Sequence, residues 1–231
     1  MIDLKTIGII RSPYKEKFGV PRQPNLVPLA RGELHLITPF NHPDCIRGLE
    51  KFSHLWLLFI FSGTAQQGWH NTVRPPRLGG NERVGVFASR STFRPNPIGL
   101  SAVELHDIVI HKEQIILKLG SVDLIDQTPI IDIKPYIPYS DSYPDAQASY
   151  AVEKPDCGLT VEFSPQVERE LVNQLELRNL IIQVIAQDPR PAYKKNKSGK
   201  QEFGIKLYHF NIRWQVENNH AVVLNVEKII G

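Results

Sequence analysis

Residues 98–119 of this chain, IGLSAVELHDIVIHKEQIILKL, decide its fold class. Two stretches rich in β-branched and other aliphatic residues, 98–110 and 114–119, are strong strand candidates. Only residues 111–113, His-Lys-Glu, separate them, and a connection this short joins antiparallel strands. The stretch therefore predicts a hairpin of two neighbouring strands.

Further strand candidates flank this hairpin at residues 7–10, 32–37, 54–61 and 83–88. Residues 54–61, HLWLLFIF, form an apolar run with three aromatic residues, which is typical of a strand buried on both faces. Residues 32–37 alternate with the period of a half-buried strand, and residues 44–51 fit one short helix. Several short strands with few helices predict a mainly β fold, an antiparallel β-barrel or curled sheet, over residues 1–140.

The rest of the chain predicts a smaller α+β domain at residues 158–231, after a linker at 141–157. Ser164 and Pro165 provide a helix cap followed by proline at the first helical position. Three apolar residues then recur at a four-residue spacing and give that helix one apolar face: Val167, Leu171 and Leu175. Apolar runs predict a strand at 159–163 and a small antiparallel sheet at 205–210, 212–216 and 221–226.

Composition excludes several classes of protein. An apolar fraction of 42% is that of a soluble globular chain, and the longest apolar run, residues 55–61, is far short of the ~20 residues of a membrane span. The net charge of +3 means that a nucleic-acid partner must be met by local basic patches. Cys45 and Cys157 lie far apart, the histidines lack metal-ligand spacing, and no signal peptide begins the chain. We therefore expect a cytoplasmic protein with no metal site and no membrane contact.

The signatures of several common enzyme classes are missing from the sequence. No G-x-G-x-x-G follows a strand and no G-x-x-x-x-G-K-[ST] occurs, which argues against nucleotide binding by those motifs. Ser101 lies outside any G-x-S-x-G elbow, which argues against a hydrolase of that kind.

Residues 74–101, RPPRLGGNERVGVFASRSTFRPNPIGLS, concentrate positive charge in a stiff setting. The segment holds one acid, Glu82, and five arginines: Arg74, Arg77, Arg83, Arg90 and Arg94. Its four prolines fix φ at several positions and so limit the directions of the guanidinium groups. A rigid, poorly neutralised arginine cluster suits a ligand that carries carboxylate or phosphate. The alternative is an irregular basic loop that joins two strands.

Three carboxylates, Asp123, Asp126 and Asp132, fall within an apolar run that should be largely buried. Buried carboxylates need partners, and the arginines of residues 74–101 are the obvious supply. Two interpretations stay open with equal weight. The carboxylates form an ion-pair lattice that holds two loops together, or they belong to a ligand site.

A second basic segment, DPRPAYKKNKSGK at residues 188–200, has five cations and no acid after Asp188. Its tyrosine, Tyr193, can stack on a base, so the loop can grip an RNA backbone. A solvated hairpin tip is the alternative when the loop is considered alone.

Four stretches together resemble the TrmO family, also called TsaA-like or YaeB: IGIIRSPYKEKFGVPRQP at 7–24, FSHLWLLFIF at 52–61, VRPPRLGGNERVGVFASRSTFRPNPIGLS at 73–101 and DLIDQTPIIDIKPYIPY at 123–139. The resemblance covers essentially the whole chain, and DPRPAY at 188–193 is similar to the C-terminal domain of bacterial members. It implies S-adenosyl-L-methionine-dependent methylation of N6 of threonylcarbamoyladenosine next to the tRNA anticodon. It also implies a β-barrel that assembles as a homodimer.

The resemblance further assigns a binding site for the methyl donor. The expected residues are Pro24, Asn25, Leu26, Ala65, Gln66, Arg90, Ser91, Leu100, Ser101, Thr128, Pro129, Ile130 and Ile131. Family members commonly have D-G-T-P where this chain has Gln127 in place of the glycine, so we expect an ordinary right-handed backbone at Gln127. Lys51 also replaces a frequent glycine.

The implied reaction sets two chemical requirements. The acceptor nitrogen belongs to a urea and is poorly nucleophilic, so a base should help by ~10²–10⁴-fold, and Asp126 and Asp132 are the candidates. The threonyl group carries a carboxylate, for which Arg77 or Arg94 could form a bidentate pair. We expect contacts to the substrate, the anticodon arm of tRNA, from Arg74, Arg77, Arg94, Arg190, Tyr193, Lys194 and Lys195.

Two other functions fit the same residues. The chain could be a non-catalytic RNA-binding β-barrel, which would not bind S-adenosyl-L-methionine. It could also be a methyltransferase that acts on another anionic small molecule.

Overall fold

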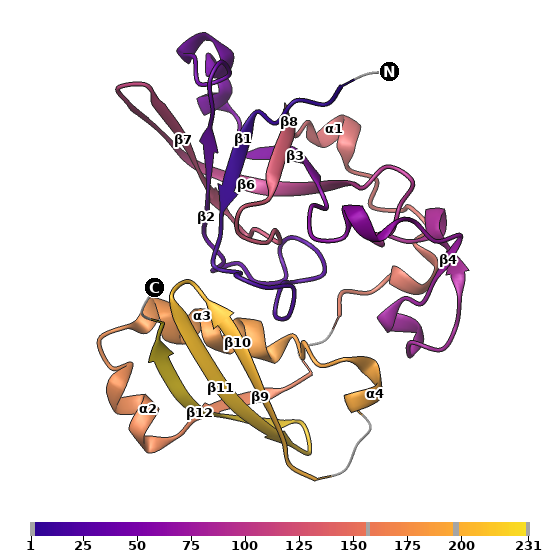
Figure 1. Cartoon of the computed structure of the whole chain (residues 1–231), viewed down its shortest axis with the longest axis vertical. Coiled ribbons are helices and arrows are strands. Elements are labelled where there is room, and N and C mark those ends of the chain that lie inside the picture. Colours follow the sequence, from indigo (N-terminus) through magenta and orange to yellow (C-terminus); the bar gives the residue numbers. More distant parts are fainter. Residues whose placement is uncertain (1–2, 156–157, 196–198, 230–231) are drawn as a thin grey trace.

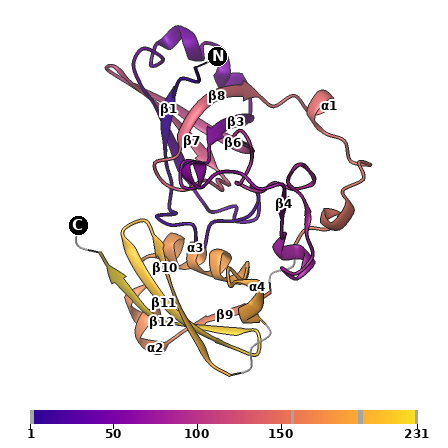
Figure 2. The same cartoon turned by 45° about the vertical axis from the view of Figure 1, so that its right-hand side comes forward.

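The computed structural model describes residues 3–155, 158–195 and 199–229 and shows two packed units (Figures 1 and 2). Strands closed into a barrel form the first unit. A long connection then leads into a four-stranded sheet, with α3 on the side that faces the barrel (Figure 2). No helix of the described residues is long and apolar enough to cross a membrane.

Six antiparallel strands close the barrel in the order β1-β2-β7-β6-β3-β8: β1 (Gly8–Arg11), β2 (Gly32–Leu36), β3 (His54–Ile60), β6 (Ile98–His111), β7 (Gln114–Gly120) and β8 (Pro129–Pro135). His111 pairs with Gln114 across a tight turn in which Lys112 has a φ of 53°. The hairpin predicted at residues 98–119 is thus confirmed. The predicted fold class, a β-barrel followed by a small α+β unit, is confirmed as well.

Side chains alternate between the inside and the outside of the barrel along β3. Leu55, Leu57 and Phe59 point into the core and are buried, while the residues between them are half-buried. The prediction of a strand buried on both faces is therefore wrong for the outer face. On the neighbouring strand, a Cβ at Gly99 would come within 2.3 Å of the Phe59 ring, so this close approach requires glycine.

The region between β2 and β3 differs from its prediction. Residues 44–51 form two 3₁₀ turns, Pro43–Ile46 and Leu49–Lys51, and not one helix. Gly48 lies between them with a φ of 87°, a left-handed conformation that breaks any continuous helix.

The long connection from β3 to β6 contains the arginine-rich segment. The strand predicted at 83–88 is mostly wrong, because only β5 (Val84–Gly85) is extended and pairs with β4 (Thr72–Val73). The β4–β5 ribbon projects from the barrel (Figure 2). The connection also contains three short 3₁₀ turns: Ala65–Gln67, Pro76–Leu78 and Val86–Ala88.

Three connections leave the same end of the barrel: 12–31, 61–97 and 121–128. The strand register fixes this arrangement, since Arg11 pairs with Glu33, Gly32 with Leu119 and Ile60 with Ile98. Segments far apart in the sequence are therefore brought together at one rim of the barrel. The second unit lies against this rim (Figure 1).

The second unit has the sheet order β10-β11-β12-β9, with β9 (Thr160–Phe163), β10 (Gln201–Leu207), β11 (Phe210–Glu217) and β12 (His220–Lys228). The antiparallel sheet predicted from three strands is confirmed for β10, β11 and β12. The remaining strand, β9, pairs parallel to β12. A parallel pair needs a crossover, and the helical region that follows β9 begins it.

Two helices form this region, α2 (Pro165–Glu170) and α3 (Leu175–Ala186). The Ser164 hydroxyl accepts a hydrogen bond from the Val167 N–H at 3.4 Å, as the sequence predicts for a cap. The predicted apolar face is wrong at Leu175, which is 63% exposed. The first helix ends at Glu170 and the second begins at Leu175, so the four-residue spacing no longer selects one face.

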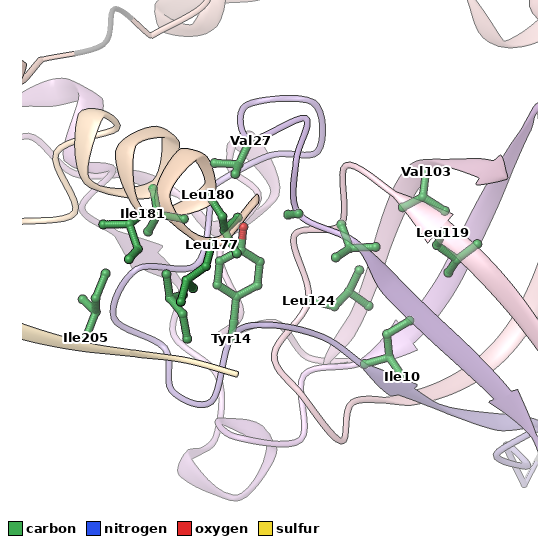
Figure 3. Close-up of a cluster of buried hydrophobic side chains, with 14 of the residues drawn as sticks. Ile10, Tyr14, Val27, Val103, Leu119, Leu124, Leu177, Leu180, Ile181 and Ile205 are labelled. Carbon is green, nitrogen blue, oxygen red and sulfur yellow. The ribbon is translucent and has the colours of Figure 1, made fainter. Parts of the chain in front are cut away.

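The two units share one hydrophobic core at the rim (Figure 3). Tyr14 lies between Leu124 of the barrel and Leu177 and Leu180 of α3. Backbone contacts also join the two units here. Tyr14 forms an isolated antiparallel β-bridge with Leu207, and the Tyr208 N–H donates to the Pro13 carbonyl at 2.7 Å.

The connection between the units contains α1 (Pro138–Asp141) and a turn at Ser149–Ala151. The Trp56 indole N–H donates to Asp141 Oδ2 at 2.9 Å and ties α1 to the outside of the barrel. The last short helix, α4 (Ala192–Lys195), follows α3. Cys45 is exposed and free, whereas Cys157 lies outside the described residues.

Candidate ligand site at one end of the barrel

Arg90 connects two of the three loops at the rim. Its guanidinium donates a hydrogen bond to the side-chain oxygen of Gln23, which directly precedes Pro24, Asn25 and Leu26. These three predicted donor-site residues therefore lie close to Arg90. Asn25 has a φ of 63°, and its carbonyl accepts from Lys154 at 3.4 Å, so the loop has a defined shape.

The third loop brings Asp123 near Arg90. Asp123 Oδ1 is shielded from solvent and has no hydrogen-bond partner among the described residues. Burial raises the pKa of this carboxyl to about 6, although a hydrogen bond from Ser101 and the charge of Arg90 oppose the shift. Burial also raises the pKa of Tyr14, and the charge of Asp123 adds to that effect. The rim therefore contains a buried acid whose ionisation changes near neutral pH.

Asp126 is an anchor between loops. Its carboxylate accepts from the Ser12 N–H at 3.0 Å and from Lys15 Nζ at 2.7 Å. Burial alone would raise the pKa of Asp126, but these hydrogen bonds and the lysine charge lower it below the ordinary value. A carboxylate with such partners stays ionised and is a poor proton acceptor.

Asp132 lies elsewhere, on the outer face of the barrel. In the strand register, Leu58 is opposite Asp132 on one side and opposite Leu100 on the other. Asp132 thus shares a row with Leu100, a predicted donor-site residue. Its carboxylate pairs with Lys134 at 2.9 Å and remains 46% exposed, so an incoming group can reach it.

The ion-pair interpretation is therefore wrong for the arginines. The partners of Asp126 and Asp132 are Lys15 and Lys134. The charge of Arg90 lowers the pKa of Asp123, but the two side chains form no salt bridge in the described part of the chain.

The predicted conformation of Gln127 is wrong. Its φ is 69°, in the left-handed region that the family's glycine occupies easily. The turn is held by the Gln127 N–H, which donates to the Ile10 carbonyl at 2.9 Å, and by the Thr128 hydroxyl, which donates to the Ile125 carbonyl at 2.6 Å. The hydrogen bonds of the loop thus impose a conformation that the side chain at this position disfavours.

The other predicted donor-site residues fall on different faces. Leu100 and Ser101 point to opposite sides of β6, Leu100 outward with 53% exposure and Ser101 inward and buried. Ile130 is fully buried, and its carbonyl accepts a hydrogen bond from the Ile7 N–H at 2.8 Å, while Ile131 lies where the register of β8 shifts. The remaining members of the set lie around the rim: Ala65 and Gln66 in an exposed turn, Ser91 beside Arg90, Thr128 and Pro129 where β8 begins.

Backbone carbonyls hold two of the predicted substrate-binding arginines. Arg94 donates to the carbonyls of Val86, at 3.2 Å, and Ser89, at 2.7 Å. Arg77 donates to the carbonyl of Glu153 in the connection between the units. In the described ranges, none of the five arginines of residues 74–101 forms an ion pair with an acid, so the cluster is poorly neutralised, as predicted.

The connection from β3 to β6 forms one wall of an open cavity of about 660 Å³. It is lined by Trp69, His70, Asn71, Thr72, Val73, Arg74, Arg83, Ser91 and Phe93. Of the predicted site residues, Arg74 and Ser91 are among these. The aromatic lining was not predicted from the sequence, although aromatic residues beside arginines are the usual signal of base stacking.

In the second unit, Arg190 is buried and committed to Asp188. Its guanidinium makes two parallel contacts to that carboxylate, at 2.7 and 3.0 Å. Lys195 Nζ lies 3.0 Å from the same carboxylate. Arg190 therefore faces the protein interior and not a substrate. Lys194 is half-buried, while the side chain of Tyr193 and residues 196–198 lie outside the described part of the chain.

Comparisons with known proteins agree with this architecture. Residues 9–142 match the family model of the tRNA-methyltransferase O N-terminal domain, and residues 156–229 match that of the TrmO C-terminal domain. The tRNA (adenine(37)-N6)-methyltransferase of Escherichia coli (strain K12) is 58% identical over 96% of both chains. A putative S-adenosylmethionine-dependent methyltransferase, RcsF, of Pseudomonas aeruginosa is 45% identical over 90% of both chains. The crystal structure of TrmO from Pseudomonas aeruginosa superposes with a TM-score of 0.78 at 36% identity and covers 98% of both chains. These matches span the barrel and the second unit, and the chain belongs to the TrmO family.

Proposed function

We propose that the protein is an S-adenosyl-L-methionine-dependent tRNA methyltransferase that methylates N6 of threonylcarbamoyladenosine next to the anticodon. Family membership supports the reaction class, since relatives carry the names tRNA (adenine(37)-N6)-methyltransferase and S-adenosylmethionine-dependent methyltransferase. The observation that carries the proposal at the level of residues is the meeting of three loops around Arg90.

Residues at this rim and on the adjoining outer face of the barrel fit the methyl donor, which supplies a methyl group on a cationic sulfonium. The donor has an amino-acid carboxylate, ribose hydroxyls and a flat purine. Arg90, already oriented by Gln23, offers a cation for the carboxylate. Leu100 offers exposed apolar surface, and Asp132 in the same row offers hydrogen-bond acceptors.

The three carboxylates take different roles in this proposal. Asp132 is the accessible candidate for the base that receives the proton of the acceptor nitrogen. Asp126 holds the loops together. Asp123 is a positioning residue, because its charge acts on Arg90 and its carboxyl bonds Ser101.

We propose that the enzyme works in the cytoplasm, where its tRNA substrate is found. We also propose that it acts as a homodimer. Apolar side chains on the outer surface near α1, including Ile137 and Tyr139, are exposed and suit a second copy. Light scattering of the purified chain tests the assembly.

Nucleoside mass spectrometry tests the reaction. Transfer RNA from a strain that lacks the enzyme is incubated with the purified protein and S-adenosyl-L-methionine. A mass gain of one methyl group on threonylcarbamoyladenosine is expected. An RNA-binding barrel without enzymatic activity would bind the RNA but leave it unchanged and show no heat of binding with S-adenosyl-L-methionine.

A further inference from the structure

The cavity beside the β4–β5 ribbon has the size of a small-molecule site. Its volume of about 660 Å³ falls within the ~300–1,000 Å³ of typical ligand pockets. Arg90, Leu100 and Asp132 are not among the residues that line it. Ser91 lines the cavity and directly follows Arg90, so the cavity adjoins the proposed donor site.

Aromatic rings line part of the cavity. The rings of His70 and Phe93 lie 5.1 Å apart, and Lys17 Nζ lies 5.7 Å from the Phe93 centroid. Trp69 lines the same cavity and is 53% exposed. Exposed aromatic faces at a protein–RNA contact stack on unpaired bases.

Two arginines give the cavity positive charge. The β4–β5 ribbon pairs Val73 with Val84, so Arg74 and Arg83, one residue beyond on each strand, lie opposite each other. Like charges opposite each other on a ribbon repel. Arg83 donates a hydrogen bond to the Thr72 hydroxyl at 2.8 Å, and none of the described residues that line the cavity is an acid. An anion between the two guanidiniums removes the repulsion.

We infer that this cavity receives the acceptor nucleotide, with its base against the aromatic rings and the carboxylate of its threonyl group between Arg74 and Arg83. The inference rests on the proposed function and names the substrate-binding part of the site. From the sequence, Arg77 or Arg94 was expected to bind this carboxylate. Both already donate to backbone carbonyls, so the inference assigns the carboxylate to Arg74 and Arg83. A backbone phosphate of the RNA has the same charge and is the competing source of the anion.

A substrate pair separates the two sources. Anticodon-arm RNA is prepared with threonylcarbamoyladenosine as the free acid and as its neutral methyl ester, which leaves every phosphate in place. Methyl transfer is measured for the wild-type protein, Arg74→Gln and Arg83→Gln. Arg47→Gln is the matched control, since Arg47 is an exposed arginine in the connection between β2 and β3.

The wild-type protein should prefer the acid over the ester in kcat/KM by about 10–100-fold. Arg74→Gln and Arg83→Gln should lower kcat/KM for the acid, leave the ester almost unchanged and so abolish the preference. Arg47→Gln should behave as wild type. An equal loss for acid and ester indicates a phosphate contact and overturns the inference, as does full retention of the preference.

A binding measurement keeps this inference separate from the proposed function. Trp69 lines the cavity, so quenching of its fluorescence by free threonylcarbamoyladenosine reports occupancy, with Trp69→Phe to identify the signal. The affinity measured by this quenching should weaken about tenfold or more in Phe93→Leu and in Arg74→Gln, and this result supports the site. If the wild-type protein transfers no methyl group but shows this quenching, the reaction fails and the site stands. If methyl transfer occurs and neither variant changes the quenching, the site is wrong and the reaction stands.

Discussion

Lys15 Nζ lies 2.7 Å from Asp126 Oδ2, and this ion pair fastens the loop after β1 to the loop before β8. The Ser12 N–H donates to the other oxygen of the same carboxylate. The pair therefore maintains the rim of the barrel, on which the proposed donor site depends. It also distinguishes Asp126 from the two other carboxylates of the loop and strand that follow β7.

Asp126→Asn should lower stability more than catalysis. We expect a loss of about 1–2 kcal/mol in unfolding free energy at pH 7, since a partly exposed lysine moderates the contribution of the pair. The folded pKa of Asp126 is lowered, so this contribution is present above about pH 4 and is lost as the pH falls through the folded value. Thermal denaturation at pH 3 and pH 7 checks the difference. Lys15→Gln should give a similar loss that is not additive with the first, and additive losses would contradict the pair.

Asp132→Asn should give the reverse result. The carboxylate is exposed and paired only with Lys134 among the described side chains, so its removal should change the melting temperature little. The rate of methyl transfer at saturating substrates should fall by ~10²–10⁴-fold if Asp132 is the base. A single-turnover rate within about threefold of wild type would exclude this role, with Lys134→Gln as the control for the neighbouring charge.

Asp123 makes stability depend on pH in the opposite sense from Asp126. Burial raises its pKa from 3.8 to about 6, so its contribution to stability is complete below pH 3.8 and is lost as the pH rises through about 6. Asp123→Asn should therefore stabilise the protein at pH 8 by up to roughly 3 kcal/mol and have little effect at pH 4. Chemical denaturation across this range measures the gain. Asp145→Asn, an exposed aspartate, serves as the control, and a gain independent of pH would rule out the buried carboxylate as its source.

Arg190→Gln should destabilise the second unit. The buried guanidinium neutralises Asp188, and removal of one partner of a buried pair costs about 3–5 kcal/mol. Denaturation monitored by circular dichroism gives the loss, and Lys194→Gln is the matched control. If Arg190→Gln keeps wild-type stability but weakens tRNA binding, the residue contacts RNA and the structural role is wrong.

Local pattern was enough to predict several strands of the barrel, but it left a curled sheet open, and only the family resemblance implied the closed barrel. The hairpin at residues 98–119 depends on apolar runs and one short turn, and both are properties of neighbouring residues. The helix at Ser164 was equally accessible, because a cap and a proline act within one turn. Leu175 was predicted wrongly, since a break in the helix resets which face each later residue occupies.

The candidate site was less predictable because its decisive contacts are long-range. Nothing near Arg77 in the sequence indicates that the carbonyl of Glu153 will hold it, and Lys15 is far from Asp126 along the chain. The left-handed backbone at Gln127 is likewise imposed by the distant Ile10 carbonyl. Residue type indicated the chemistry of this region, but only the fold shows which groups remain free.

The most direct test of the account compares two preparations of tRNA that differ only in the threonylcarbamoyl group on the adenosine next to the anticodon. The purified protein and S-adenosyl-L-methionine are added to each, and methyl incorporation into that nucleoside is followed by mass spectrometry. Methylation of the modified tRNA with at least ~10²-fold slower turnover of the unmodified tRNA is the predicted result. Equal turnover of both, or methylation of neither, would contradict the account.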